Sequence, residues 1–462
     1  MTKEEKNLQN AMTEGVIWKQ LLLFFFPIVL GTFFQQLYNT ADAIIVGKFV
    51  GKEALAAVGG TTGTLINLLV GFFVGLSSGA SVIISQFFGA RRPDDVSRAV
   101  HTTMALALAS GAALTVLGIW SSRAVLVMMG TPEDVLGHAV TYINIYFLGM
   151  IPSLIYNIGS GILRAVGDSR RPLFFLISAT MTNIVLDVVL VIGLNMGVAG
   201  AAAATVLSQV VSAVLVMMTL CRSPQVYRVQ LKKIRFYGDM LVRIVRIGLP
   251  AGLQSAVFAI SNIVIQSAIN SLGKVVMAAS SAACNIEVFA YDVMNSYNQA
   301  CTTFVGQNYG AGQIRRCRKT LYLCLIEDAV SLGATVALVL LTGRFLLSIF
   351  NNDPQVIALG YDRLKIVFFA YIFSLLYEVM SGYLRGFGIS LVPAALTALG
   401  VCGIRIAWIH FVFPQHPTLQ TIMTSYPVSL SATALMIFIA LLCYRPARKH
   451  AAMEREPAPA GK

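Results

Sequence analysis

Long apolar stretches, separated by short polar or charged segments, make up most of the chain. Each stretch can cross a hydrocarbon core of roughly 30 Å as a helix. Only helices satisfy their backbone groups within one segment in lipid. The pattern therefore predicts an all-α membrane protein with twelve transmembrane helices. They are Val16–Val46, Ala54–Phe88, Ala99–Ser121, Thr141–Leu163, Leu173–Leu194, Val198–Leu220, Leu241–Leu272, Val275–Val305, Leu321–Leu341, Ile366–Leu384, Leu391–Phe413 and Ile422–Tyr444.

The second half of the chain repeats the first. The segment Y-N-I-G-S-G-I-L-R-A-V-G from Tyr156 aligns with Y-E-V-M-S-G-Y-L-R-G-F-G from Tyr377. At the same offset, Q-F-F-G-A at Gln86–Ala90 aligns with Q-N-Y-G-A at Gln307–Ala311. Helices one to six therefore repeat as helices seven to twelve. Because six is an even number, both halves enter the membrane from the same side. Such parallel repeats are typical of alternating-access carriers, which bind their substrate between the two lobes.

The repeat and the distribution of basic residues set the expected organisation. Most of the 34 Lys and Arg residues lie in the N-terminal segment, in the loops that follow even-numbered helices, and in the C-terminal tail. Cytoplasmic loops accumulate Lys and Arg, so both termini are expected in the cytoplasm of a multi-pass plasma (inner) membrane protein. The expected parts are a cytoplasmic N-terminal segment (1–15), an N-terminal lobe (16–221), a cytoplasmic linker (222–240), a C-terminal lobe (241–445) and a cytoplasmic tail (446–462).

The composition supports a membrane carrier and not an enzyme. Hydrophobic residues make up 56% of the chain and charged residues only 12%, whereas soluble chains carry about 25% charged residues. The net charge of +13 is explained by the loop distribution, so nucleic-acid binding is not expected. The sequence contains no H-E-x-x-H, G-x-S-x-G or P-loop motif, and the five histidines show no metal-ligand spacing. We expect no enzymatic activity and no cofactor.

Four polar side chains share one face of the first helix. Gln35, Tyr38, Asn39 and Asp42 stand at i, i+3, i+4 and i+7. An ionisable residue at membrane depth costs at least ~2.5 kcal/mol and often marks an ion or substrate pathway. Asp42 is therefore a candidate functional group.

Helices four, five and six add further polar residues to the first lobe. Asn183 and Asp187 are one turn apart in helix five, Thr205 lies in helix six, and Tyr156 and Asn157 lie in helix four. Two carboxylates close together in a low dielectric cannot both stay ionised without a cation, so either a proton or a metal ion is required. Asn, Thr and Asp oxygens suit a hard cation such as Na⁺. Taken singly, the amides and hydroxyls also fit ordinary interhelical hydrogen bonds.

The repeat does not duplicate this pair of acids. Ile265 aligns with Asp42, and Trp408 aligns with Asp187. The acids of the second lobe lie instead at Glu287, Asp292 and Glu378, which form a candidate second-lobe site. Two faces of helix eight carry acids, and the sequence leaves open which of them lines a cavity.

Three further charged residues have open roles. Arg405 is the only basic residue predicted deep in a helix, where a salt bridge with a second-lobe acid is one interpretation. Glu327 and Asp328 fall nearer a predicted helix end. A solvated position and a functional role are both compatible with that placement.

The chain resembles the multidrug and toxic compound extrusion (MATE) family over nearly its whole length. The resemblance rests on the twelve spans, the repeat, P-I-V-L-G and Y-N-T-A-D within Pro27–Asp42, G-I-L-R-A-V-G-D at Gly161–Asp168, and V-G-Q-N-Y-G-A-G at Val305–Gly312. It implies a V-shaped pair of pseudo-symmetric six-helix lobes. It also implies export of cationic amphipathic compounds in exchange for H⁺ or Na⁺. The expected partners are small cationic substrates and membrane lipids, and we expect a monomer.

Within that family the chain is more similar to the DinF-like branch. The resemblance places the branch's paired aspartates on Asp42 and Asp187 and its cation-site Asn and Thr on Asn183 and Thr205. It places polar cavity positions on Gln35, Tyr38 and Asn157, to which the helix faces add Asn39 and Tyr156. It also places a bending proline, a candidate hinge, on Pro27, where a static kink is the alternative. A lipid-linked precursor flippase of the same broad superfamily is the alternative function, and it would need a cavity lined by several Arg residues.

Overall fold

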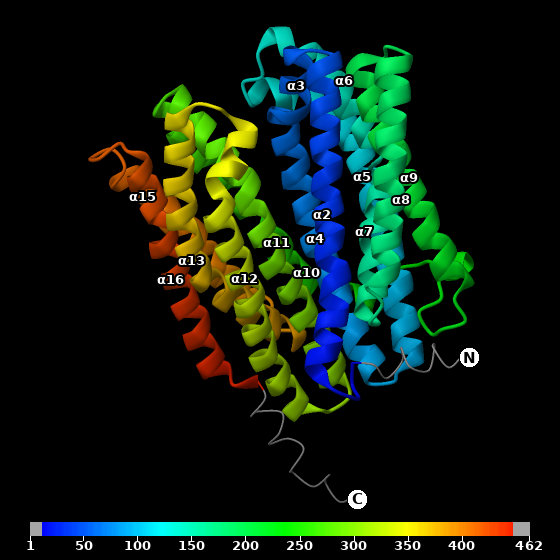
Figure 1. Cartoon of the computed structure of the whole chain (residues 1–462). Coiled ribbons are helices and arrows are strands. Elements are labelled where there is room, and N and C mark those ends of the chain that lie inside the picture. The colour runs from blue at the N-terminus through cyan, green and yellow to red at the C-terminus, as the bar shows by residue number, and fades with distance from the viewer. Residues whose placement is uncertain (1–11, 447–462) are drawn as a thin grey trace, which may run out of the picture. The chain divides into compact units, whose positions relative to one another are not determined.

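The computed structural model describes residues 12–446, and every regular element in that range is a helix (Figure 1). This confirms the predicted all-α fold. Residues 1–11 and 447–462 lie outside the described residues, and they include most of the predicted N-terminal segment and of the tail.

The first half of the chain contains seven longer helices and three short elements. The π-helical stretch is η1 and the 3₁₀ turn is η2. In order they are α2 (Ile17–Phe49), α3 (Lys52–Gly59), α4 (Thr61–Gly89), α5 (Pro93–Met128), α6 (Glu133–Leu148), α7 (Met150–Ala165), α8 (Arg170–Asp187), η1 (Val188–Gly193), α9 (Gly197–Arg222) and η2 (Leu231–Lys233).

The second half follows the same plan. Its π-helical stretch, η3, interrupts the segment that was predicted as helix eleven. In order the elements are α10 (Gly238–Ser271), α11 (Lys274–Gly310), α12 (Ile314–Phe350), α13 (Pro354–Gly386), α14 (Leu391–Thr397), η3 (Ala398–Gly403), α15 (Ile404–Phe411) and α16 (Leu419–Tyr444).

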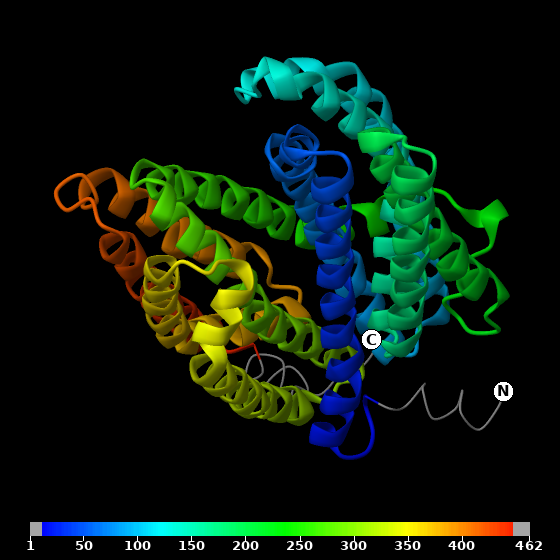
Figure 2. The ribbon, with the colours of Figure 1, turned by 45° about the horizontal axis from the view of Figure 1, so that its top comes forward.

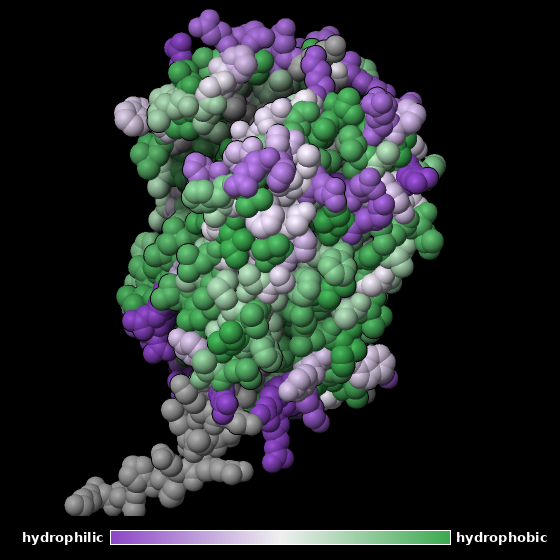
Figure 3. Space-filling view, turned by 90° about the vertical axis from the view of Figure 1, so that its left-hand side faces the viewer, coloured by the Kyte–Doolittle hydropathy of each residue, from purple (hydrophilic) through white to green (hydrophobic). Residues whose placement is uncertain are grey.

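The helices have the length and composition of membrane spans. Ten of those described are long and apolar enough to cross a membrane. Helices α6 and α7, bent by 52° around Gly149, form an eleventh candidate span. Helix α11 has 37 residues but does not reach the same hydropathy, because polar side chains interrupt its apolar residues. Each of the twelve predicted stretches falls on these helices. On the face shown in Figure 3, apolar residues cover the middle and hydrophilic residues gather toward both ends.

The described chain forms two compact units whose boundaries fall inside helices. The first unit runs from Phe26 to Gly252, and the second contains residues 12–25 and 253–446. Helices α2 and α10 are therefore each divided between the units. Each of them carries an internal proline close to the division, Pro27 in α2 and Pro250 in α10.

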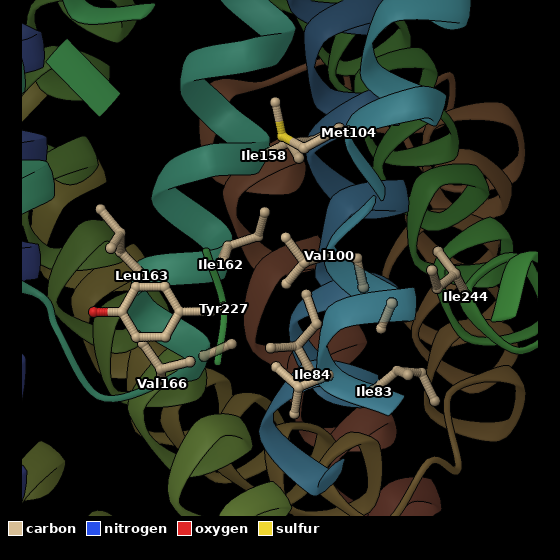
Figure 4. Close-up of a cluster of buried hydrophobic side chains, with 14 of the residues drawn as sticks. Ile83, Ile84, Val100, Met104, Ile158, Ile162, Leu163, Val166, Tyr227 and Ile244 are labelled. Carbon is tan, nitrogen blue, oxygen red and sulfur yellow. The ribbon is translucent and has the colours of Figure 1, made fainter. Parts of the chain in front are cut away.

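Buried apolar side chains, mainly from α4, α5, α7, α9 and α10, form one core cluster of the first unit (Figure 4). Ile83 and Ile84 of α4 lie in one cluster with Val100 of α5, Ile162 of α7 and Ile244 of α10, all of them buried. This packing fixes α7 against α4 and α5. This core therefore supports the helices of the unit that carry the polar residues.

Glycines let α4 and the first part of α10 approach each other closely. A Cβ atom built on Gly75 would lie 2.6 Å from the Cα of Gly252. A Cβ atom on Gly79 or on Gly248 would overlap the backbone of the opposite helix in the same way. Small residues at helix interfaces allow such backbone contact in membranes. This crossing therefore has no room for larger side chains.

The second unit is built around α11, α12 and α13, which pack against one another (Figure 2). The start of α2 belongs to this unit. The ring of Phe25 stacks on Tyr297 of α11 with the centroids 4.0 Å apart. The Nδ2 atom of Asn308 donates a hydrogen bond to the carbonyl of Met12 (3.1 Å), and Nη1 of Arg316 donates one to the carbonyl of Gly15 (3.0 Å). These contacts anchor residues 12–25 to the second unit.

Candidate functional site: buried carboxylates in two separate units

Two buried carboxylates of the first unit have oxygens that lack a hydrogen-bond partner among residues 12–446. Asp42, in the last third of α2, is 6% exposed, and Asp187, the last residue of α8, is fully buried. One oxygen of Asp42 and both oxygens of Asp187 accept no hydrogen bond from any described residue. The two carboxylates are close enough for their charges to interact. Uncompensated buried carboxylates are costly, so this neighbourhood favours a bound proton or cation.

Asn183 and Thr205 supply neutral oxygens from two helices that pack against each other. Asn183 belongs to α8, which also carries Asp187, and Thr205 belongs to α9. Asn183 lies one turn before Asp187, is fully buried, and neither its amide oxygen nor its amide nitrogen is hydrogen-bonded within residues 12–446. The Thr205 hydroxyl donates to the carbonyl of Ala201 (3.0 Å), which leaves its oxygen able to accept or to coordinate. Carboxylate, amide and hydroxyl oxygens are the donors that a hard cation prefers. The chemistry of the four residues thus fits Na⁺ as well as H⁺.

Tyrosines complete this neighbourhood, and two of them were not predicted. Tyr38 of α2 interacts electrostatically with Asp42 and Asp187. Tyr142 and Tyr146 of α6 are buried, stack with their centroids 6.3 Å apart, and interact with Tyr38. Their spacing of four residues in a predicted span is a helical-face signal that could have identified them. The neighbourhood of the acids therefore includes the phenol groups of these three tyrosines.

The other predicted cavity residues do not join this group. Gln35 and Asn39 are exposed, and the Asn39 amide lies 3.4 Å from Oε1 of Gln36 on its own helix. Asn157 donates to the carbonyl of Ser153 one turn earlier (2.9 Å). The Tyr156 hydroxyl donates to the carbonyl of Pro172 (3.4 Å), at the opposite end of α8 from Asp187. Of the five positions, only Tyr38 interacts electrostatically with both carboxylates.

A cavity of about 420 Å³ opens near the start of α8 and the end of α9, away from these acids. Asp168 and Arg171 line it together with Phe175, Arg222 and Tyr227. Asp168 accepts hydrogen bonds from the backbone N–H groups of Arg170 and Arg171 (both 3.1 Å), so it caps the start of α8. None of the predicted site residues lines this cavity.

Glu287 in the second unit is already neutralised by an arginine. Nε and Nη2 of Arg363 lie 2.7 and 2.8 Å from the two Glu287 oxygens, and both side chains are buried. The expectation that Arg405 is the only basic residue deep in a helix is therefore wrong. The predicted span begins at Ile366 and so excludes Arg363, but α13 begins twelve residues earlier, at Pro354.

Glu378 belongs to a second acidic group of the second unit. Its carboxylate accepts a hydrogen bond from the amide of Asn298, and both residues are buried. Asp328 of α12 is fully buried, interacts electrostatically with Glu378, and has no hydrogen-bond partner among residues 12–446. Asp292, the third predicted acid of the second lobe, is only partly buried. It lies in α11 six residues before Asn298, on a different turn of that helix. Of the two roles left open for Asp328, a solvated position is excluded by its burial.

Comparisons with known proteins agree with this architecture. The family model MatE matches residues 27–189 and 250–409. The probable multidrug resistance protein YoeA of Bacillus subtilis (strain 168) is 26% identical over 447 residues, covering 95% of this chain and 96% of that protein. The probable multidrug resistance protein YpnP of the same organism is 28% identical over 403 residues, covering 85% and 88%.

A solved structure shows the same fold. It is described as the outward-facing conformation of a multidrug resistance MATE family transporter of the MOP superfamily. It superimposes with a TM-score of 0.87 at 23% identity, covering 97% of this chain and 99% of that chain. The match of the family model to most of the sequence shows that the chain belongs to the multidrug and toxic compound extrusion family of membrane transporters.

Proposed function

We propose that this protein is a secondary antiporter that exports cationic amphipathic compounds in exchange for H⁺ or Na⁺. The observation that carries the proposal is the pair of buried carboxylates, Asp42 and Asp187, in which one oxygen of Asp42 and both oxygens of Asp187 lack hydrogen-bond partners among the described residues. The multidrug resistance relatives support the substrate class. The features of the DinF-like branch and the plasma-membrane location with cytoplasmic termini are part of the same proposal.

Charge balance at the acids provides the coupling. A proton or Na⁺ on Asp42 and Asp187 removes the negative charge that would hold a cationic drug, so the drug leaves. Release of the ion restores that charge and favours binding of the next cation. Exchange requires the ion to bind the two access states with different affinity, because a ligand with equal affinity shifts no equilibrium. A hinge at Pro27 would supply such a difference in affinity, because bending α2 there would move the part of the helix that carries Asp42.

Uptake into proteoliposomes tests the proposal. The purified protein is reconstituted, and accumulation of a fluorescent cation is followed under a proton gradient and, separately, under a sodium gradient. We expect Asp42→Asn and Asp187→Asn each to reduce gradient-driven uptake at least tenfold, because a neutral amide cannot exchange a proton or balance a cation.

Asp134→Asn is the matched control, since Asp134 is an exposed carboxylate in the first turn of α6. It should transport at the wild-type rate. Wild-type rates in both Asp42 and Asp187 variants would rule out the coupling site. Uptake by the wild type under neither gradient would rule out antiport.

The alternative, a lipid-linked precursor flippase, needs several uncompensated arginines around a pyrophosphate group. Arg363 is compensated by Glu287, and Arg405 is the one buried arginine near it that forms no ion pair with a described carboxylate. This charge arrangement favours the antiporter.

A further inference from the structure

A buried guanidinium in the second unit has no acidic partner among the residues that the structure describes. Arg405 of α15 is 6% exposed, and Nε donates to the Ser429 hydroxyl (3.0 Å). The guanidinium carbon lies 4.0 Å from the centre of the Tyr426 ring. Its Nη1 and Nη2 groups donate no hydrogen bond to residues 12–446, and no Asp or Glu in that range forms an ion pair with it. Arg405 stands about 9 Å from the end of α15, at a rise of about 1.5 Å per residue.

The neighbouring arginine shows the contrast. Arg363 packs on the same Tyr426 ring, with its guanidinium carbon 6.0 Å from the ring centre. All three of its nitrogens have partners, supplied by Glu287, Ser280 and Cys284. Of the two arginines around this tyrosine, only Arg363 has a carboxylate partner among the described residues. The cluster keeps one uncompensated positive charge in a buried place, where a charge without a counter-ion is costly.

The geometry around Arg405 leaves its two terminal nitrogens, Nη1 and Nη2, without a hydrogen-bond partner among residues 12–446. Ser429 holds Nε and donates its own proton to the carbonyl of Tyr426 (3.1 Å), so the hydroxyl fixes the orientation of the guanidinium. The Tyr426 ring covers one face of the cation. The two terminal nitrogens form the fork with which arginine binds carboxylate or phosphate oxygens in a bidentate manner.

The internal repeat places this arginine near the counterpart of the acidic site. Trp408, one turn after Arg405, aligns with Asp187. The same segment of the repeat therefore carries a carboxylate in the first unit and a guanidinium in the second. The two units present opposite charges from equivalent elements.

We propose that Arg405, oriented by Tyr426 and Ser429, binds the carboxylate or phosphate group of an amphipathic substrate. The substrates then include compounds that carry an acidic group, which Arg405 binds within the second unit. This inference rests on the proposed transport function for its physiological meaning, but it is a claim about binding and can be tested without a gradient.

The test compares rhodamine B with its ethyl ester. The two dyes share a cationic ring system and differ in one free carboxylate. Their dissociation constants are measured by fluorescence anisotropy with the full-length protein in phosphatidylcholine nanodiscs. We expect the wild type to bind rhodamine B about tenfold more tightly than the ester, as a charge-assisted hydrogen-bonded pair provides. Arg405→Gln should abolish this preference, and Arg405→Lys should retain part of it, because lysine keeps the charge and loses the fork.

Arg344→Gln is the matched control, because Arg344 also lies over a tyrosine ring, that of Tyr361, but is exposed. It should keep the acid-to-ester ratio of the wild type. If Arg405→Gln does not fold, Ser429→Ala, which frees Nε, should lower the ratio. A wild-type ratio near one, or a ratio unchanged in Arg405→Gln, would overturn the proposal.

Two competition arms identify the source of the oxyanion. Inorganic phosphate that displaces rhodamine B but not the ester indicates a soluble oxyanion. Selective displacement by phosphatidylglycerol added to the nanodiscs assigns the same arginine to a lipid headgroup. The acid-to-ester ratio is measured without a gradient, so failure of the antiport mechanism and failure of the Arg405 site give different results.

Discussion

Single charged residues in this protein differ mainly in whether the fold provides a counter-ion. The Glu287–Arg363 pair is buried and bidentate, with side-chain exposures of 7% and 2%. We expect Glu287→Gln to destabilise the protein by about 3–5 kcal/mol, the typical cost of removing one partner of a buried ion pair. Thermal unfolding in detergent, followed by the loss of the monodisperse elution peak, measures the change.

The chain offers a control for that variant in the same helix as Arg363. Lys365 and Asp362 of α13 form an equally close ion pair at 2.6 Å, but both side chains are exposed. Exposed pairs contribute little, so Asp362→Asn should leave the unfolding temperature nearly unchanged. Equal shifts in the two variants would show that burial does not govern the Glu287–Arg363 pair.

At the scale of elements, the crossing of α4 and α10 depends on the absence of side chains. A methyl group at Gly248 would meet the Leu76 backbone, which cannot move as a flexible side chain could. We expect Gly248→Ala to lower the unfolding temperature by several degrees, since overpacking costs about 1–3 kcal/mol. Gly333→Ala in α12 is the control, because nothing lies within 4 Å of its new methyl group. It should be neutral or stabilising, and a loss as large as that of Gly248→Ala would refute the close-packing argument.

Helices with a long apolar stretch were the ones that the sequence predicted. Most spans could be located from the sequence because about 20 apolar residues in a row have no other stable form in lipid. The start of α13 could not be located, because Arg363 reads as a loop residue until Glu287, far away in sequence, is seen beside it. The bend at Gly149 was also missed, since it depends on packing between helices. Tyr142 and Tyr146 share a helical face, which the sequence shows, but their position beside Tyr38 does not follow from it. In the candidate site, burial of Asp42 and Asp187 was predictable, but the loss of Gln35 and Asn39 from their neighbourhood was not.

For the whole molecule, the charge distribution predicts an orientation. A green fluorescent protein joined to the C-terminus should fluoresce in a bacterial host, because it folds to its fluorescent form in the cytoplasm. The same fusion with alkaline phosphatase should be inactive, since that enzyme needs the oxidising periplasm for its disulfides. The opposite pair of results would invert the topology that the Lys and Arg residues predict.

The division of α2 and α10 between the two compact units affects how the chain could be divided into fragments and how it could have evolved from a half-length ancestor. Each half lends the opening part of its first helix to the other half: residues 12–25 complete the second unit, and the start of α10 completes the first. A fragment ending after Arg222 would contain residues 12–25, which belong to the second unit. It would lack the start of α10, which belongs to the first unit. Neither fragment would then contain a complete unit. The two fragments would have to be co-expressed, so that each could supply the helix segment that the other lacks. A half-length ancestor would, by the same geometry, have closed its core only as a swapped dimer.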